Sequence, residues 1–247
     1  LGIPEEDRQK LVSWMEFLEL AQYFTYEIIK EQNEGKTEST PDPAIIDMFN
    51  SMVDEMFDYG RFILKDKREN PSDDLLTAIA NAEIDGEKLS DEFLDGSWLL
   101  IIFAGNDTTR NTMSGGIKLL HENQTQKDLL MQNQDLIPNF INETVRCVSP
   151  VIHMRRTTLE ETEINGQRIG AHEKVALWYG AANRDPAIFE NPDEFNILRK
   201  NADKHLAFGI GRHTCLGKPV ALMQLQEFYS QFLSRFQDFE MNGEWKV

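Results

Sequence analysis

The spacing of apolar residues predicts helices over most of the chain. Apolar side chains recur every three or four residues over 11–24 and again over 45–63, which is typical of two amphipathic helices that pack against a core. The stretch between them, residues 31–42, is polar and rich in turn formers, so we expect an exposed loop there. Further helices are expected over residues 126–147, ending before Pro150.

A long apolar segment after Ser90 predicts a helix of about 30 residues. Ser90 is a suitable N-cap, and the acidic pair Asp91 and Glu92 complements the positive end of the helix dipole. The middle of the segment is apolar on nearly all sides, so we expect it to be buried. A shorter helix is predicted to begin after residues 71–74, and Asp85-Gly86 is typical of a turn.

Residues with high β propensity replace the helical pattern after Pro150. Strands are predicted at residues 154–158, 162–164 and 174–179, with a turn at Asn165-Gly166. Irregular chain over 181–204 leads to a last helix that begins near Val220. The expected fold is therefore mainly α with a small β portion.

The composition indicates a globular, acidic protein. The chain has 247 residues, 40% of them hydrophobic, and a formal net charge of −17 from 25 basic and 42 acidic residues. A chain of this length can bury a sizeable core, whereas nucleic acid and anionic membrane surfaces repel an acidic protein. We see no signal-peptide pattern and no apolar run long enough to span a membrane, and the two cysteines fit a reducing compartment. A cytoplasmic location is the expectation.

One cysteine, Cys215, lies in a glycine-punctuated turn directly before the last helix. The segment reads Phe208-Gly209-Ile210-Gly211-Arg212-His213-Thr214-Cys215-Leu216-Gly217. The positive end of the helix dipole favours a thiolate there, which suits a nucleophile or a soft metal ligand. The glycines let the backbone approach a flat ligand closely, because no Cβ stands in the way. The pattern indicates an iron ligand.

Other roles for Cys215 were weighed. A structural zinc site needs four N or S ligands at short spacing, and the only other cysteine, Cys147, is far away in the sequence. A catalytic Cys–His pair needs an oriented base, and His213 is expected to point to a different side of the turn. An ordinary buried cysteine acts as a small hydrophobe, but the surrounding glycines argue against that role.

The segment around Cys215 resembles the haem-binding loop of the cytochromes P450, which in soluble bacterial members reads Phe-Gly-x-Gly-x-His-x-Cys-x-Gly. The resemblance implies a cytochrome P450 fold with haem b (iron protoporphyrin IX), Cys215 as its thiolate ligand, and Phe208, Gly209 and Gly217 around the ligand. It covers essentially the whole chain, and family members are longer at both ends. Residues 1–247 are therefore expected to form a single haem domain that lacks an N-terminal portion and a C-terminal hairpin.

The long helix contains a second segment of interest, Ala104-Gly105-Asn106-Asp107-Thr108-Thr109-Arg110. An acid in an apolar helix is costly unless it has a function, although a threonine that bonds back to a helix carbonyl is the ordinary alternative. The segment resembles the oxygen-activation motif of the family. The resemblance implies that Ala104 lies against the haem, that Thr108 holds dioxygen through a hydrogen bond, and that Asp107 relays solvent protons.

A charged pair after the long helix matches another family feature. Glu143 and Arg146, three residues apart, would ordinarily form a surface ion pair, but they resemble the buried Glu-x-x-Arg pair behind the haem. A third arginine is expected just before Phe195, where this chain has Glu194, so either the cluster is altered or Arg199 substitutes.

The two haem propionates require cationic or hydrogen-bonding partners. The resemblance assigns His213 and Arg156 to this role. Arg155 should face the other way, because side chains alternate along a strand.

Residues 153–158, 178–179 and 105–115 together resemble the bacterial subgroup that hydroxylates the terminal carbon of alkanes and fatty chains. Steroid side-chain hydroxylases share part of this pattern. A steroid or terpenoid substrate is therefore one alternative, and a haem-thiolate protein without monooxygenase activity is another. The residues expected to contact a hydrophobic substrate are Ile101, Ala104, Val151 and Ile152.

The resemblance implies a monooxygenase that inserts one oxygen atom from O₂ into an unactivated C–H bond. The chain has no flavin, nicotinamide or iron–sulfur fingerprint, so we expect the electrons to come from a ferredoxin and its reductase. Ferredoxins are typically acidic, and so is this chain, which means that docking requires a local basic patch. Lys204, Arg212 and Lys218 are the candidates.

Overall fold

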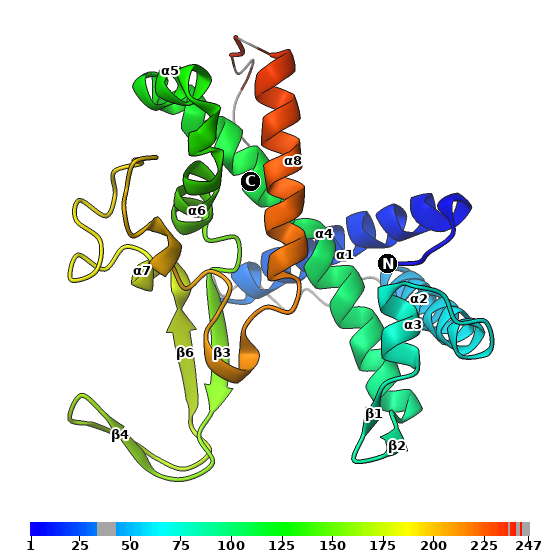
Figure 1. Ribbon diagram of the computed structural model, residues 1–247. Helices are drawn as coiled ribbons and strands as arrows, with labels where there is room; N and C mark the ends of the chain where they lie inside the picture. The colour runs from blue at the N-terminus through cyan, green and yellow to red at the C-terminus, as the bar shows by residue number, and fades with distance from the viewer. Residues whose placement is uncertain (34–42, 237, 241–242, 244–247) are drawn as a thin grey trace. The chain divides into compact units, whose positions relative to one another are not determined.

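The computed structural model describes residues 1–33, 43–236, 238–240 and 243, apart from the side chains of 19, 21–29, 31–33 and 106 (Figure 1). The chain divides into two compact units, Leu1–Asp107 and Thr108–Val247. Helices predominate, and the described strands pair into small two-stranded antiparallel sheets. The expectation of a mainly α fold with a small β portion is confirmed.

The first unit consists of helices and one short hairpin. Its elements are the 3₁₀ turn η1 (Glu5–Asp7), α1 (Arg8–Asn33), α2 (Pro43–Glu69), α3 (Leu75–Ala80), β1 (Glu83–Ile84), β2 (Glu87–Lys88) and the first half of α4 (Asp91–Glu122). The two amphipathic helices predicted from the sequence are α1 and α2. The predicted loop begins later than expected, because α1 continues to Asn33, and residues 34–42 lie outside the described part of the chain.

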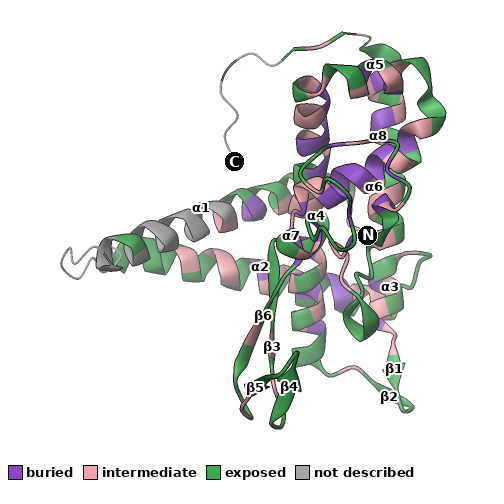
Figure 2. Cartoon of the chain, turned by 90° about the vertical axis from the view of Figure 1, so that its left-hand side faces the viewer, coloured by how far each residue is buried: buried purple, intermediate pink, exposed green. Residues whose placement is uncertain are grey.

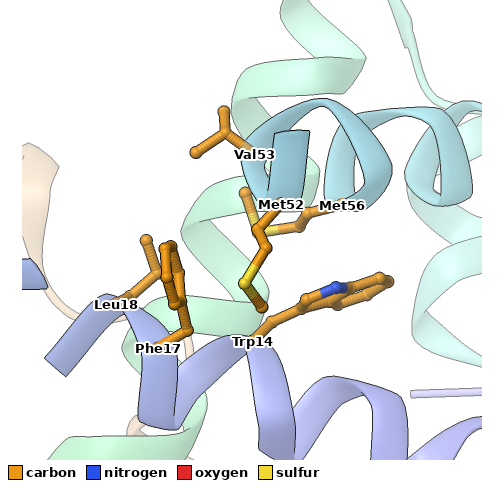
Figure 3. A pocket seen from close by; sticks show the side chains of 6 residues that line it. All are labelled: Trp14, Phe17, Leu18, Met52, Val53 and Met56. Carbon is orange, nitrogen blue, oxygen red and sulfur yellow. The ribbon is translucent and has the colours of Figure 1, made fainter. Parts of the chain in front are cut away.

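An apolar core joins α1, α2 and α4 in the first unit. Trp98 of α4 is buried, and its indole N–H donates to the Met56 carbonyl at 2.9 Å. A Cβ at Gly60 would lie 2.3 Å from the Trp98 ring, so the glycine allows α2 to approach α4 closely. Figure 3 shows the small apolar pocket where α1 meets α2; it is lined by Trp14, Phe17, Leu18, Met52, Val53 and Met56.

Two helix starts predicted from the sequence are confirmed by their caps. The Asp74 carboxylate accepts from the Thr77 N–H at 2.8 Å at the start of α3 and pairs with Lys67 at 2.6 Å. Burial by itself would raise the pKa of Asp74, but hydrogen bonds from Lys67, Ser72 and Thr77 outweigh it and hold the pKa well below its ordinary value. At the start of α4, the Ser90 hydroxyl accepts from the Phe93 N–H at 3.2 Å.

The middle of α4 is buried on one side only, which corrects the expectation from its sequence. Trp98 and Ile102 are buried, whereas Leu100 is 67% exposed. A helix packed against one layer buries a single stripe, and an apolar pattern all round does not reveal which stripe the protein covers.

The second unit begins within α4 and ends after α8. It contains α5 (Gln124–Gln132), η2 (Gln134–Leu136), α6 (Ile137–Val148), β3 (His153–Thr157), β4 (Thr162–Ile164), β5 (Gln167–Ile169), β6 (Lys174–Trp178), α7 (Tyr179–Ala182), η3 (Ala202–Lys204), η4 (Gly211–His213) and α8 (Lys218–Arg235). The antiparallel pair β3–β6 places His153 opposite Trp178. Asn165 and Gly166 have φ of 50° and 79°, so they form the expected tight turn between β4 and β5.

The core of the second unit is built around α6. Figure 2 shows buried residues along much of this helix, and its buried apolar residues are Ile137, Phe140, Ile141 and Val145. They pack against Leu225, Tyr229 and Leu233 of α8, among others. Within the described part of the chain, none of the helices combines the length and apolarity required to cross a membrane.

Candidate functional site

The loop before α8 is closed by backbone hydrogen bonds. The Cys215 N–H donates to the Phe208 carbonyl at 2.8 Å, and the Thr214 N–H donates to the Gly211 carbonyl at 3.1 Å. The Cys215 carbonyl accepts from the Lys218 N–H at 3.3 Å, so α8 begins directly after the loop. Cys215 itself is exposed. The fold therefore presents a free sulfur at the N-terminal end of a helix.

Glycines shape this loop and keep bulk away from the sulfur. Gly209 and Gly211 have φ of 70° and 72°, a region that favours glycine. A Cβ at Gly209 would also lie 3.1 Å from the His213 carbonyl oxygen. At Gly217 an added Cβ would lie 3.8 Å from the Cys215 sulfur, so the glycine leaves the space beside the sulfur open.

The surroundings of Cys215 fit a prosthetic group that takes one protein ligand. In the described residues, no group of three or more His, Cys, Asp or Glu side chains is placed to hold a metal ion. Ile210 and Leu216, on either side of Cys215, are 74% and 81% exposed, and apolar side chains of this kind can cover a large hydrophobic ligand. A single thiol, an open glycine loop and exposed apolar neighbours together match what a haem requires.

The Phe208 ring is held on two sides. The His205 ring lies 5.6 Å from it between centroids, and the Lys218 ammonium lies 5.4 Å from its centroid. His205 is buried, and burial, followed by the charge of Lys218, lowers its pKa to about 4. Sequence reasoning missed His205. The only signal was a histidine directly before the apolar run that leads to Phe208.

Glu143 and Arg146 of α6 form a buried ion cluster in the second unit. Arg146 donates to Glu143 through Nε and Nη2, both at 2.8 Å, and neither side chain is exposed to solvent. Arg199 donates to the same carboxylate at 3.0 and 3.1 Å. Arg199 is therefore the third member of the cluster. Glu194 contributes its backbone carbonyl, which accepts from Arg146 at 3.1 Å and Arg199 at 3.0 Å.

Asn183 connects this cluster to the chain that enters the loop. Its carbonyl accepts from Arg146 at 2.8 Å, and its side-chain amide donates to the Ser149 hydroxyl at 2.8 Å. Its side-chain oxygen accepts from the Leu206 N–H at 2.6 Å, two residues before Phe208. Sequence reasoning also missed Asn183, because its hydrogen-bond partners are distant in the sequence.

The two residues assigned to the propionates lie on different segments of the second unit. Arg156 is half-buried on β3, opposite Val175 of β6, and the exposed Arg155 is opposite Ala176. Neighbouring residues of a strand point to opposite faces, as expected for these two arginines. His213 is exposed in η4, within the Cys215 loop.

The oxygen-motif residues lie in the middle of α4. Asp107 ends the first unit and Thr108 begins the second, and both are half-buried, whereas Ala104 is exposed. The Thr112 hydroxyl, which the sequence reasoning did not consider, donates to the Thr108 carbonyl at 2.8 Å. The side chain of Asn106 is not described.

The four residues expected to contact substrate have different exposures. In the first unit Ile101 is half-buried and Ala104 is exposed. In the second unit Val151 is half-buried and Ile152 is 60% exposed, at the start of the β3–β6 ribbon.

Comparison with known proteins gives one consistent family. A family model described as Cytochrome P450 matches residues 40–244. Cytochrome P450-terp of a Pseudomonas species is 34% identical over 244 residues, covering 98% of this chain and 55% of the relative. Linalool 8-monooxygenase of Pseudomonas putida is 38% identical over 190 residues, covering 77% of this chain and 47% of the relative. Among solved structures, CYP109E1 from Bacillus megaterium in complex with testosterone has a TM-score of 0.83 at 29% identity, covering 100% of this chain and 62% of that one.

The chain therefore belongs to the cytochrome P450 family, as its resemblance predicted. Members of this family bind haem b, the cofactor expected from the sequence. The chain spans about half the length of the curated relatives that it matches.

Proposed function

We propose that this protein is a haem-thiolate monooxygenase that inserts one oxygen atom from O₂ into an unactivated C–H bond of a hydrophobic substrate. The observation that carries the proposal is the exposed sulfur of Cys215 in a closed glycine loop at the start of α8, in a chain of the P450 family. The haem, when bound, supplies the activation of dioxygen, and a thiolate ligand favours O–O cleavage.

The residues around the loop have supporting roles in this proposal. Cys215 is the iron ligand, Gly209 and Gly217 keep the backbone close to the macrocycle, and Phe208 packs near the sulfur and helps to set its hydrogen bonding and potential. Arg156 and His213 hold the propionates with cationic or hydrogen-bonding groups. The Glu143–Arg146–Arg199 cluster holds the scaffold and takes no part in the chemistry.

Asp107 and Thr108, the residues that resemble the oxygen-activation motif, control the delivery of protons in this proposal. The Thr108 hydroxyl donates a hydrogen bond to dioxygen, and the Asp107 carboxylate passes solvent protons to the same place, which is a general-acid task. Small residues at 104 and 105 leave room for ligands beside α4. Without the hydroxyl, reduced oxygen is expected to leave as peroxide.

Thr108→Ala is the variant that tests this proton path. We expect the yield of hydroxylated product per NADH to fall at least about tenfold, with hydrogen peroxide taking its place, since a positioned proton donor contributes about 10²–10⁴-fold. NADH oxidation, peroxide and product are measured together. Ser114→Ala is the matched control, because it removes another α4 hydroxyl, which donates to the Arg110 carbonyl at 3.0 Å. An unchanged product yield in Thr108→Ala would exclude the Thr108 hydroxyl from the proton path. A lack of hydroxylated product in the unmutated protein and in Ser114→Ala would favour a haem-thiolate protein that is not a monooxygenase.

For the substrate, we propose an apolar hydrocarbon that is hydroxylated at or near a terminal carbon. Burial of such a molecule against apolar side chains stabilises its complex by roughly 0.8 kcal/mol per methylene, so affinity is expected to rise with chain length. The sequence pattern favours an alkane or fatty chain. The linalool 8-monooxygenase relative and the testosterone complex favour the second candidate, a terpenoid or steroid side chain. Product analysis with alkanes, fatty acids, a terpene alcohol and a sterol distinguishes the two.

The electron donor in this proposal is a ferredoxin that docks on a basic patch near the Cys215 loop. Arg212 in η4 and Lys204 are exposed, whereas Lys218 is half-buried over the Phe208 ring. Arg212 is therefore the cation best placed to meet an acidic partner.

Arg212→Glu is expected to slow reduction by the ferredoxin about tenfold at low salt, because like charges then oppose the encounter. Substrate affinity should stay the same. Arg235→Glu, an equal charge reversal at the far end of α8, is the control. Stopped-flow reduction and substrate titration give the two quantities, and equal reduction rates for the two variants would refute the docking site.

A further inference from the structure

The part of α4 that belongs to the second unit contains two adjacent glycines, at which α6 and α8 approach it. A Cβ at Gly115 would lie 2.5 Å from a methyl carbon of Val148 in α6. A Cβ at Gly116 would lie 2.1 Å from the Tyr229 hydroxyl oxygen of α8 and 2.9 Å from the Thr144 methyl carbon of α6. The two glycines therefore allow both α6 and α8 to contact the backbone of α4 directly.

At this crossing Tyr229 joins α8 to α4. Tyr229 is completely buried, and its hydroxyl donates to the carbonyls of Thr112 and Met113, both at 3.0 Å. Its ring packs edge-on against Phe140 of α6, with 4.7 Å between centroids. Burial raises the pKa of Tyr229, so the hydroxyl keeps its proton and remains a donor.

A second hydrogen bond extends this connection to the oxygen motif. The Thr112 hydroxyl donates to the Thr108 carbonyl at 2.8 Å, one turn earlier in α4. Two hydrogen bonds thus run from Tyr229 through Thr112 to Thr108. At the other end, α8 begins at Lys218, three residues after Cys215 and about 16 Å of helix from Tyr229.

Because α8 is long, a small change in its tilt at Tyr229 displaces its first turn. A rotation of about 5° around Tyr229 would move the first turn of α8, and the Cys215 loop with it, by roughly 1.4 Å. A misplacement of about 1 Å is enough to lower a rate substantially when reacting groups must be aligned.

We propose that the Tyr229 hydroxyl is a positioning group that fixes the Cys215 loop at the start of α8 relative to the Thr108 turn of α4. The consequence for catalysis rests on the proposed monooxygenase function. The coupling between the two segments is a property of the protein itself, and it can be measured without turnover.

Tyr229→Phe tests the proposal, because it keeps the ring and its contact with Phe140 and removes only the hydroxyl. Tyr59→Phe is the matched control: Tyr59 lies in the first unit, and its hydroxyl donates to Asp7 at 2.7 Å. In hydrogen–deuterium exchange of the haem-loaded protein, Tyr229→Phe should exchange about tenfold faster over 108–113 and over 208–217. The electron paramagnetic resonance signal of its ferric haem should shift, and its peroxide share should rise about threefold or more. Tyr59→Phe should change none of these.

A second variant keeps the test informative if Tyr229→Phe does not fold. Thr112→Val preserves the shape of the side chain and removes its hydrogen bond to Thr108. It should speed exchange over 108–113 and leave 208–217 as it is. The proposal would be overturned if Tyr229→Phe gave the same spectra and exchange rates as Tyr59→Phe. It would also be overturned if exchange over 108–113 were unchanged in Thr112→Val. If the unmutated protein lacks a thiolate-ligated haem, the proposed function fails. The same exchange comparison, made on the protein as purified, still decides whether Tyr229 couples the two segments.

Discussion

Replacing Glu143 with glutamine is expected to lower the free energy of unfolding of the protein by about 3–5 kcal/mol. The Glu143 carboxylate accepts hydrogen bonds from two buried guanidinium groups, those of Arg146 and Arg199, at distances of 2.8 to 3.1 Å, and is the anion that pairs with both. A neutral amide would leave both positive charges buried without a counter-charge. Because domains are stable by only about 5–15 kcal/mol, the loss should be visible as a much lower urea midpoint and as poorer haem retention.

The control for this prediction is Glu161→Gln. Glu161 also pairs with an arginine, Arg168, but both side chains are exposed. Exposed ion pairs contribute about 0–1 kcal/mol, so this variant should unfold almost as the unmutated protein does. Equal midpoints for the two variants would show that the cluster on α6 contributes no more than a surface pair.

Cys215→Ser is expected to reduce hydroxylation at least about a hundredfold. Removing a group that only supports a metal ligand already lowers metal affinity or activity about 10–100-fold, and this substitution removes the ligand itself. Product formation and the electron paramagnetic resonance spectrum of the ferric haem are the measurements. A serine variant that keeps the activity would exclude Cys215 as the ligand.

The second cysteine offers the control for this substitution. The Cys147 sulfur accepts from the Arg146 guanidinium at 3.2 Å, and burial, together with the charge of Glu143, raises the pKa of its thiol to about 11. Cys147 is therefore a neutral thiol near pH 7 and a poor iron ligand. Cys147→Ser should retain both the haem signal and the activity.

The helices were predictable because their apolar spacing and caps are local. Ser90 caps α4 as its sequence predicts, and Asp85-Gly86 and Asn165-Gly166 adopt the positive φ that their turns require. Apolar spacing failed at Leu100, which is exposed although its surroundings in the sequence are apolar. Exposure depends on what packs against a helix, and periodicity does not contain that information.

The residues of the site also differ in how far they could be predicted from the sequence. Cys215 was identified because its glycines are neighbours in the sequence, and its role as iron ligand remains a proposal. Sequence alone left open whether Arg199 joins Glu143 and Arg146, since the answer depends on how irregular chain over 190–199 folds back. The structure shows that a backbone carbonyl of Glu194 and the side chain of Arg199 both reach the cluster. Asn183 and His205 have no spacing signal, because each acts through partners that only the fold brings together.

The central claim is that the sulfur of Cys215 binds the iron of a haem. The visible spectrum of the reduced protein treated with carbon monoxide tests it most directly. The account predicts the absorption band characteristic of thiolate-ligated haem, present in the unmutated protein and in Cys147→Ser and absent in Cys215→Ser. A spectrum without bound haem, or with the band of a histidine-ligated haem in the unmutated protein, would contradict it.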